Sequence, residues 1–229
     1  MLAVLPVPLT PPDLLALAVL LLAWIGSGWV IEHPPPGRAS VTRLMQAYRR
    51  DWMVEMTTRQ PRIFDATILA SLRQGTTFLT SAAMISVGGV LALAGNAERL
   101  DGLAMGVGLD APPEEVLQLR LAVVALLLVY GAFKFVWSNR LFGYCAVVMA
   151  SVPNDPSDPR TLPRAGQAAE LNVRAALNFN RGLRAVYFAF AALGWLLGPW
   201  GLLAAVAVTV WTVLSREFAS TSRGVLMED

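Results

Sequence analysis

The sequence predicts an all-α protein, a bundle of transmembrane helices with amphipathic helical extensions on the cytoplasmic side. Of the 229 residues, 55% are hydrophobic and only 15% are charged, whereas an ordinary soluble domain has about 25% charged residues. The mean hydropathy is +0.54. Uncharged stretches of about 20 residues, the length that crosses the roughly 30 Å hydrocarbon core of a bilayer, also recur along the chain.

Five spans are expected within a single domain that covers residues 1–229. The expected spans are residues 14–31, 74–95, 119–138, 178–197 and 202–218. Apolar residues continue from Ala185 to Leu214, about 30 residues, which is too long for one comfortable crossing. Because Gly198 and Pro199 interrupt this stretch, it is divided into the last two spans. A four-span alternative would place the last two arginines on the outer side.

The first span carries no basic segment before it, so we expect it to be retained as a helix rather than cleaved as a signal peptide. Residues 40–73 are expected to form a cytoplasmic helical segment that lies on the membrane surface or packs under the bundle. Its apolar face is predicted from residues spaced by four, Leu44, Tyr48, Trp52 and Met56. Asp51 and Glu55 are expected on the solvated face, in ion pairs with neighbouring arginines.

The arginines predict the orientation of the chain. With the N-terminus outside, the loops between spans one and two and between spans three and four both face the cytoplasm, and these two loops hold most of the arginines. The acidic loop 96–118 then faces outside, and the C-terminus is cytoplasmic. This arrangement follows the positive-inside rule, so we expect a multi-pass protein of the cell inner membrane.

The stretch "FKFVWSNRLFGYC" places charges at the end of the third span. If this span begins near Arg120, Lys134 lies about 21 Å further along the helix axis and Arg140 reaches the headgroups. Trp137 would then lie at the depth of the membrane interface. One interpretation is an ordinary membrane border in contact with lipid. The alternative is a polar stripe that lines a ligand pocket or pairs with Asp65, Glu170 or Glu217.

Two further groups of polar residues are candidates for lipid-headgroup contacts or ion pairs between helices. Asp65 stands near the start of the second span, close to Arg59 and Arg62, and we expect it to pair with Arg62 or Arg140. A polar collar starts the fourth span, where arginines favour a lipid phosphate. The complete set of candidates is Arg59, Arg62, Asp65, Lys134, Trp137, Arg140, Asn178, Arg181 and Arg184.

The single cysteine and the single histidine limit the chemistry. Cys145 excludes a disulfide within the chain, and His33 has no second histidine with which to ligate haem. We therefore expect no cofactor, no metal and no catalytic residue. No polar domain carries a basic face, so no nucleic-acid partner is expected.

Several separated motifs resemble a bacterial membrane family known as domain of unknown function 599. These motifs are "RDWM" and "PRIFD" between Arg50 and Asp65, "KFVWSNRLFGYC", "NFNRGLRAVYFAFAALGW" and "REFAS". The resemblance extends over nearly the whole chain after residue 10. It implies an integral membrane protein with several helices, and it brings no activity, substrate or catalytic residue.

Three function classes remain open. The first is an accessory, structural or assembly subunit that packs against a larger membrane complex, for example a respiratory or photosynthetic one; its partners are membrane lipids and that complex. The second is a transporter or channel for ions or small solutes, which requires a polar path across the bilayer. The third is an enzyme acting on lipid at the interface, which requires carboxylates close to the arginine collar. The oligomeric state is left open.

Overall fold

The computed structural model describes residues 9–96 and 112–228, and these residues form helices and connecting turns without any strand. The all-α prediction is therefore confirmed. In chain order the helices are α1 (Pro11–Glu32), α2 (Val41–Glu55), a 3₁₀ turn (Met56–Thr58), α3 (Ile63–Ala94), α5 (Glu114–Ala150), α6 (Thr161–Leu193), a 3₁₀ turn (Gly194–Leu197), α7 (Pro199–Phe218) and the short α8 (Thr221–Val225).

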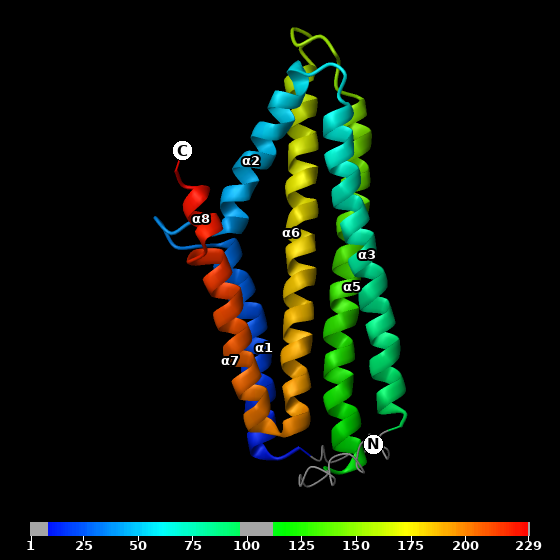
Figure 1. The fold of residues 1–229 in the computed structure, drawn as a ribbon, viewed down its shortest axis with the longest axis vertical. Helices are drawn as coiled ribbons and strands as arrows, with labels where there is room; N and C mark the ends of the chain where they lie inside the picture. The colour runs from blue at the N-terminus through cyan, green and yellow to red at the C-terminus, as the bar shows by residue number, and fades with distance from the viewer. Residues whose placement is uncertain (1–8, 97–111, 229) are drawn as a thin grey trace, which may run out of the picture.

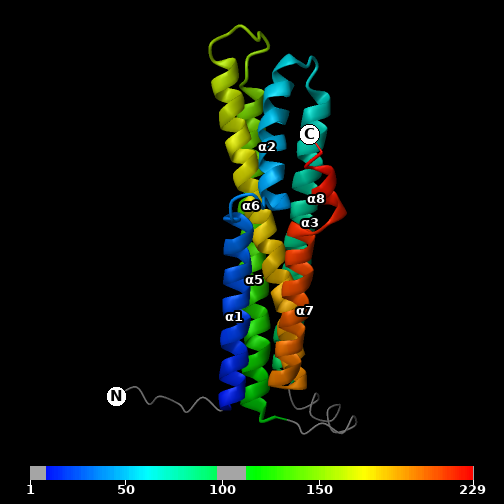
Figure 2. The same ribbon diagram turned by 90° about the vertical axis from the view of Figure 1, so that its left-hand side faces the viewer.

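Helix length divides the elongated bundle into two sections. α3, α5 and α6 contain 32, 37 and 33 residues and run side by side along the whole molecule (Figures 1 and 2). α1 and α7, with 22 and 20 residues, cover only the lower part in Figure 1. We call the part alongside α1 and α7 the membrane section. The rest, where α2 lies, is the extension, and it rises about 20 Å further, since each helical residue adds about 1.5 Å.

Among the described residues, four helices are long and apolar enough to cross a membrane, namely α1, α3, α5 and the helical stretch Pro199–Val225. They indicate a multi-pass membrane protein. The prediction of five spans is wrong by this measure, because α6, which contains residues 178–197, is not among the four. The part of α6 that runs through the membrane section carries Arg181 and Arg184, and both arginines form salt bridges with Glu32 of α1. α6 nevertheless runs through this section in contact with α1, α5 and α7.

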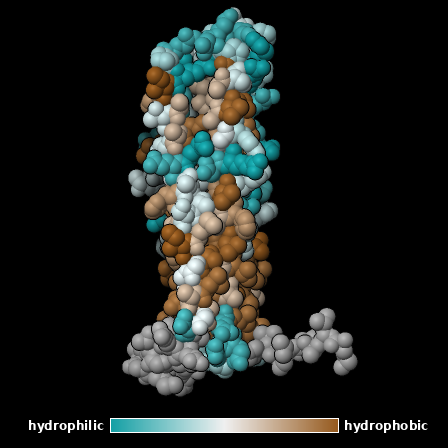
Figure 3. Space-filling view, turned by 90° about the vertical axis from the view of Figure 1, so that its right-hand side faces the viewer, coloured by the Kyte–Doolittle hydropathy of each residue, from teal (hydrophilic) through white to brown (hydrophobic). Residues whose placement is uncertain are grey.

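Surface hydropathy follows the same division. On the face formed by α3 and α5, apolar residues cover the membrane section, and a hydrophilic band crosses the molecule at mid-height above them (Figure 3). Each section has its own core. Ala16, Leu20, Leu128, Phe188 and Trp195 belong to the core of the membrane section, and Met53, Leu69, Phe142, Cys145 and Met149 belong to that of the extension. The molecule is therefore stabilised by apolar packing both inside and beyond the membrane level.

Polar helices continue where loops were expected. α5 extends to Ala150 and α6 begins at Thr161, so only a short turn joins them at the tip of the extension. The stretch 40–73 is divided into α2 and the start of α3 by a turn that contains a cis Gln60–Pro61 peptide bond. α2 packs on α6. Of the two expected positions of this segment, on the membrane surface or against the bundle, the structure therefore shows packing against the bundle.

The predicted apolar face of α2 is wrong in its register. Of the residues spaced by four, only Met56 is fully buried, while Tyr48 is exposed. The buried positions of α2 include Thr42 and Gln46. Polar residues face inward because α2 meets polar partners: both the amide and the hydroxyl of Thr42 donate to the Glu217 carboxylate of α7, at 2.9 and 2.8 Å.

Two local features connect the helices of the membrane section. The sequence Thr10-Pro-Pro-Asp13 forms a capping box at the start of α1, with proline in the first turn. Between α6 and α7 the chain turns at Gly198, whose φ of 90° favours glycine. The two helices approach closely at Gly201, where an added Cβ would lie 2.5 Å from the Gly194 carbonyl oxygen.

Candidate functional site

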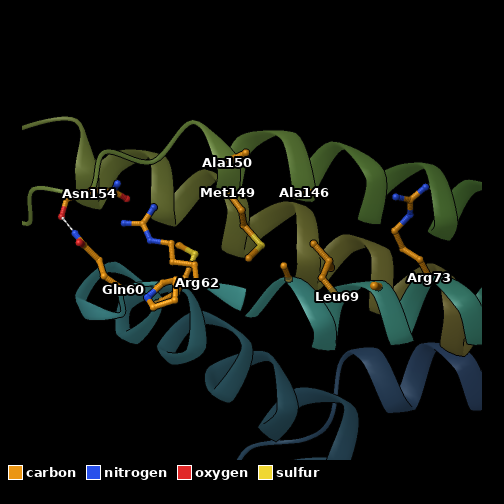
Figure 4. A pocket seen from close by; sticks show the side chains of 12 residues that line it. Gln60, Arg62, Leu69, Arg73, Ala146, Met149, Ala150 and Asn154 are labelled. Atoms are coloured by element: carbon orange, nitrogen blue, oxygen red, sulfur yellow. Dashed lines mark hydrogen bonds between the residues drawn. The ribbon is translucent and has the colours of Figure 1, made fainter. Parts of the chain in front are cut away.

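A groove between α3 and α5 opens on one face of the extension, with a volume of about 770 Å³ (Figure 4). Leu69 of α3 and Met149 of α5 contribute apolar side chains to it. Alanines on both helices leave the space between them open, because their side chains are short. These alanines, Ala66, Ala70, Ala146 and Ala150, recur at helical spacing on the two facing surfaces.

Polar side chains stand at both ends of this α3–α5 groove. At the tip, Arg62 donates to the backbone carbonyls of Val152 and Pro153 at 2.7 and 2.8 Å, just after α5 ends. Gln60 donates to the Asn154 carbonyl at 2.9 Å. Arg73 stands at the other end (Figure 4). The groove therefore combines an apolar middle with arginines at its two ends, which favours an amphipathic, acidic occupant.

Asp65 belongs to the first turn of α3 and is fully buried. Its Oδ1 accepts a hydrogen bond from Arg59 at 2.6 Å and another from the Trp52 indole at 2.7 Å. The expected pairing with Arg62 or Arg140 is therefore wrong, because Arg62 is bound to backbone carbonyls and Arg59 reaches Asp65 from the preceding turn. The contact connects α2 to α3, which indicates a structural role.

A second cavity between α3 and α5 has a volume of about 550 Å³. We call it the interface cavity. It shares Arg73 with the α3–α5 groove and also contains Arg140 and Tyr144 from α5. Hydroxyl groups of Thr77, Thr80 and Ser81 complete its polar lining.

Both arginines of the interface cavity are held by their Nε atoms. The Arg73 Nε donates to the Asn139 Oδ1 at 3.3 Å, and the Arg140 Nε donates to the Tyr144 hydroxyl oxygen. Asn139 is itself fixed by a 2.8 Å hydrogen bond to Thr77. Within residues 9–96 and 112–228, no acidic side chain forms a salt bridge with Arg73 or Arg140. The outer edges of two guanidinium groups are therefore oriented toward solvent without a counter-charge.

A different arginine pair lies on the side where α1 meets α6. Arg181 donates to the Glu32 Oε1 with its Nε at 3.0 Å and to Oε2 with one Nη, and Arg184 also donates to Oε1. The Arg184 side chain is only 8% exposed. It packs against Gly28, where an added Cβ would lie 3.5 Å from the Arg184 Nε. These two candidates are thus an interhelix ion-pair cluster.

The level of both arginine pairs follows from a contact at the opposite end of the bundle. There the buried Asp13 accepts hydrogen bonds from Arg120 at 3.1 Å and from the Trp195 indole at 2.7 Å. From this contact, Glu32 lies about 28 Å along α1 and Arg140 about 30 Å along α5. Both distances match the thickness of a bilayer hydrocarbon core. The two arginine pairs therefore lie at one level of the bundle, about the thickness of a hydrocarbon core away from the Asp13–Arg120 contact.

The three remaining candidates do not meet in one place. The Lys134 amine lies 5.2 Å from the centre of the Tyr130 ring, which is a cation–π contact within one helix. Trp137 is half exposed, and Asn178 is buried with its amide donating to the Arg174 carbonyl at 2.9 Å. Tyr130 lines a cavity together with Arg181 and Arg184, whereas Arg140 and Tyr144 line the interface cavity. The predicted stripe is therefore divided between two faces.

Sequence reasoning did not predict several of these partners. Glu32 was treated as part of a loop although it ends α1, and Arg73 and Asn139 were not singled out. The Asp13–Arg120–Trp195 contact joins positions more than 70 residues apart, and the Thr-x-x-Asp capping sequence is the local signal that could have pointed to Asp13. Arg49 is a further residue whose partner the sequence did not predict. It donates to Asn172 of α6, and burial lowers the pKa of its guanidinium.

Together, the fold and these sites define a multi-pass helical membrane protein with a helical extension and two interfacial arginine pairs. The chain matches, over residues 15–222, the family described as a protein of unknown function, DUF599, and it belongs to that family. A search of proteins with curated descriptions found no similar sequence. A search of solved structures found no similar fold.

Proposed function

We propose that the protein is an accessory subunit that packs against a larger membrane protein through the face formed by α3 and α5. One observation carries this proposal: α3 is long and apolar, yet it is mainly covered on one side only, by α5. In the most apolar part of α3 only 11% of the residues are buried, against 56% in α5. The α3–α5 groove continues the same open face into the extension.

The chemistry of this face supports one kind of partner. In the membrane section α3 exposes small residues, Ser81, Gly88 and Ala92, beside larger apolar ones. Small residues allow another transmembrane helix to approach closely. In the extension the groove carries arginines at its ends. We therefore propose a partner whose transmembrane helix continues into an acidic, amphipathic segment.

The core of the membrane section supports a subunit in preference to a transporter. Packed apolar side chains fill the space between α1, α5, α6 and α7. A transport path would need polar groups through this region. The arginines of α2 and of the neighbouring parts of α3, α5 and α6 support an orientation with the extension in the cytoplasm and the start of α1 on the periplasmic side of the inner membrane.

Matched substitutions on two helices test the proposal. Ala92→Leu adds bulk to the open face of α3, and Ala204→Leu adds the same bulk to an exposed position of α7. Ala70→Leu fills the α3–α5 groove. After solubilisation in mild detergent, we expect a stoichiometric partner to remain with the parent chain and with Ala204→Leu. The partner should be lost from Ala92→Leu and Ala70→Leu.

Two results would contradict the proposal. One is a parent chain that leaves native membranes alone, as a single monodisperse species. The other is a partner retained equally by all three variants, because the contact would then lie elsewhere on the bundle. Far-ultraviolet circular dichroism of each variant serves as the control for folding.

A further inference from the structure

We propose that the interface cavity binds the phosphate group of an anionic phospholipid. The proposal concerns Arg73 and Arg140. It can be tested without the partner proposed above, although both proposals use Arg73 at the end of the open α3–α5 face. It starts from the hydrogen bonds of these two guanidinium groups, each of which is held by a neighbour through Nε. Anchoring through Nε leaves the two Nη groups of each arginine to form the forked contact that phosphate oxygens accept.

Tyr144 adds a third donor to the same cavity. Its hydroxyl oxygen accepts the hydrogen bond from Arg140, so its own hydrogen is free to be donated to a ligand. Thr77 and Asn139 are committed to each other and to Arg73, and they act as supports. Because these contacts hold the donors before any ligand arrives, less ordering is required on binding.

The position of the cavity favours a lipid over a soluble ligand. Arg140 lies about 30 Å along α5 from Arg120, the distance between the two borders of the hydrocarbon core. Below the cavity, α3 exposes the large apolar side chains of Phe78 and Ile85, and α5 exposes Val136, which also lines the cavity. An acyl chain can lie along this wall while its phosphate contacts the arginines. Anionic lipids are attracted to basic residues at such interfaces.

The paired cluster on the other side supports the assignment by contrast. Glu32 accepts hydrogen bonds from both Arg181 and Arg184, so those guanidinium groups have a counter-charge within the protein. In the described part of the chain, Arg73 and Arg140 have none. A phosphodiester from the surrounding lipid would supply the negative charge that Glu32 supplies at the other pair.

Native mass spectrometry of the full chain in mild detergent tests the proposal. Three probes are compared: dioleoylphosphatidylglycerol, dioleoylphosphatidylcholine and inorganic phosphate. We expect the anionic lipid to bind in preference to the zwitterionic one. The double variant Arg73→Gln/Arg140→Gln should lower its affinity by about tenfold, because two charge-assisted contacts are removed. Tyr144→Phe should lower the affinity by about threefold, because it removes one neutral hydrogen bond.

A control variant removes the same charge elsewhere. Arg50 and Arg174 both pair with Glu170 on the surface of the extension, so Arg50→Gln/Arg174→Gln should leave the lipid affinity unchanged. Unchanged affinity in Arg73→Gln/Arg140→Gln would overturn the proposal, as would equal losses in the two double variants. If inorganic phosphate binds as well as the lipid, the site recognises a soluble phosphate, and the lipid assignment is wrong. Tyr144→Phe keeps the test valid if the double variant does not fold.

Discussion

Two arginine pairs lie at the same level of the bundle and differ in the groups that accept their hydrogen bonds. Arg181 and Arg184 meet Glu32 between α1 and α6, and the Arg184 side chain is only 8% exposed. Arg73 and Arg140 lie between α3 and α5, are both exposed, and are held by Asn139 and Tyr144. The first pair has its counter-charge within the protein. The second pair has neutral hydrogen-bond acceptors only.

Burial explains the difference. A charged side chain removed from water costs several kcal/mol unless a partner of opposite charge accompanies it. Arg184 is enclosed by α1 and α6, so the fold requires a carboxylate there. Arg73 and Arg140 remain in contact with solvent or headgroups and need no internal carboxylate. An interfacial arginine without an acidic partner is therefore the one available to a ligand, and the paired arginine is structural.

The largest expected effect is on stability when the buried carboxylate is neutralised. Glu32→Gln leaves Arg184 buried beside a neutral amide, so the free energy of unfolding should fall by about 3 kcal/mol. Equilibrium unfolding in mixed micelles measures this loss. Glu170→Gln is the matched control, because Glu170 also contacts two arginines but is 47% exposed; its loss should stay below about 0.5 kcal/mol. Equal losses in the two variants would falsify the explanation by burial.

A smaller loss is expected at the opposite end of the bundle. Asp13→Asn preserves the shape of the side chain but leaves Arg120, whose side chain is 8% exposed, without its carboxylate. The free energy of unfolding should fall by about 2 kcal/mol, because a charged hydrogen bond and its buried partner are affected. The same unfolding assay measures it.

The control for Asp13 is Asp158→Asn. Asp158 contacts the exposed Arg160 in the turn between α5 and α6. Because both side chains lie in solvent, the free energy of unfolding should stay close to that of the parent chain. If Asp13→Asn were equally mild, Arg120 would have another partner or would reach water, and the contact would not mark the membrane border.

Much of the helical architecture could be predicted from composition, because hydropathy averages over many residues. The count of spans failed at α6 for a definite reason. Arg181 and Arg184 lower the hydropathy of that segment, and the compensating Glu32 lies on another helix about 150 residues away in sequence. A single-sequence reading has no means of knowing that such a charge will be paired inside the bundle.

The candidate site shows the same limit at the level of side chains. Arg140 was marked as an interfacial residue from its place after the third span, and Arg73 from α3 was overlooked. The two line one cavity only because α3 and α5 pack side by side in a particular register. Likewise Asp65 forms its salt bridge with Arg59 and not with Arg62. The turn through Pro61 directs the Arg62 side chain to the end of α5, where it donates to the Val152 carbonyl. The packing of the helices determines which side chains form such pairs, and the spacing of residues along the sequence does not reveal that packing.

A modest effect on stability is expected from giving Arg73 an acidic partner within the protein. Asn139→Asp places a carboxylate where the Asn139 amide oxygen now accepts from Arg73. The free energy of unfolding should rise by at most about 1 kcal/mol, as is usual for an exposed ion pair, and the affinity for the anionic lipid should fall. Asn96→Asp, which adds the same charge at the far end of α3, is the control for net charge. An unchanged affinity in Asn139→Asp would show that Arg73 takes no part in binding.

The smallest effect on stability is expected from Arg140→Gln. The Arg140 guanidinium is exposed, and its hydrogen bond and cation–π contact within the described residues are both with Tyr144 of its own helix, so the free energy of unfolding should change by less than about 0.5 kcal/mol. The affinity for the anionic lipid should nevertheless fall. Arg184→Gln should behave in the opposite way, losing stability while retaining the lipid, because its guanidinium serves Glu32. The comparison fails if both variants lose stability and lipid together, since the two pairs would then share one role.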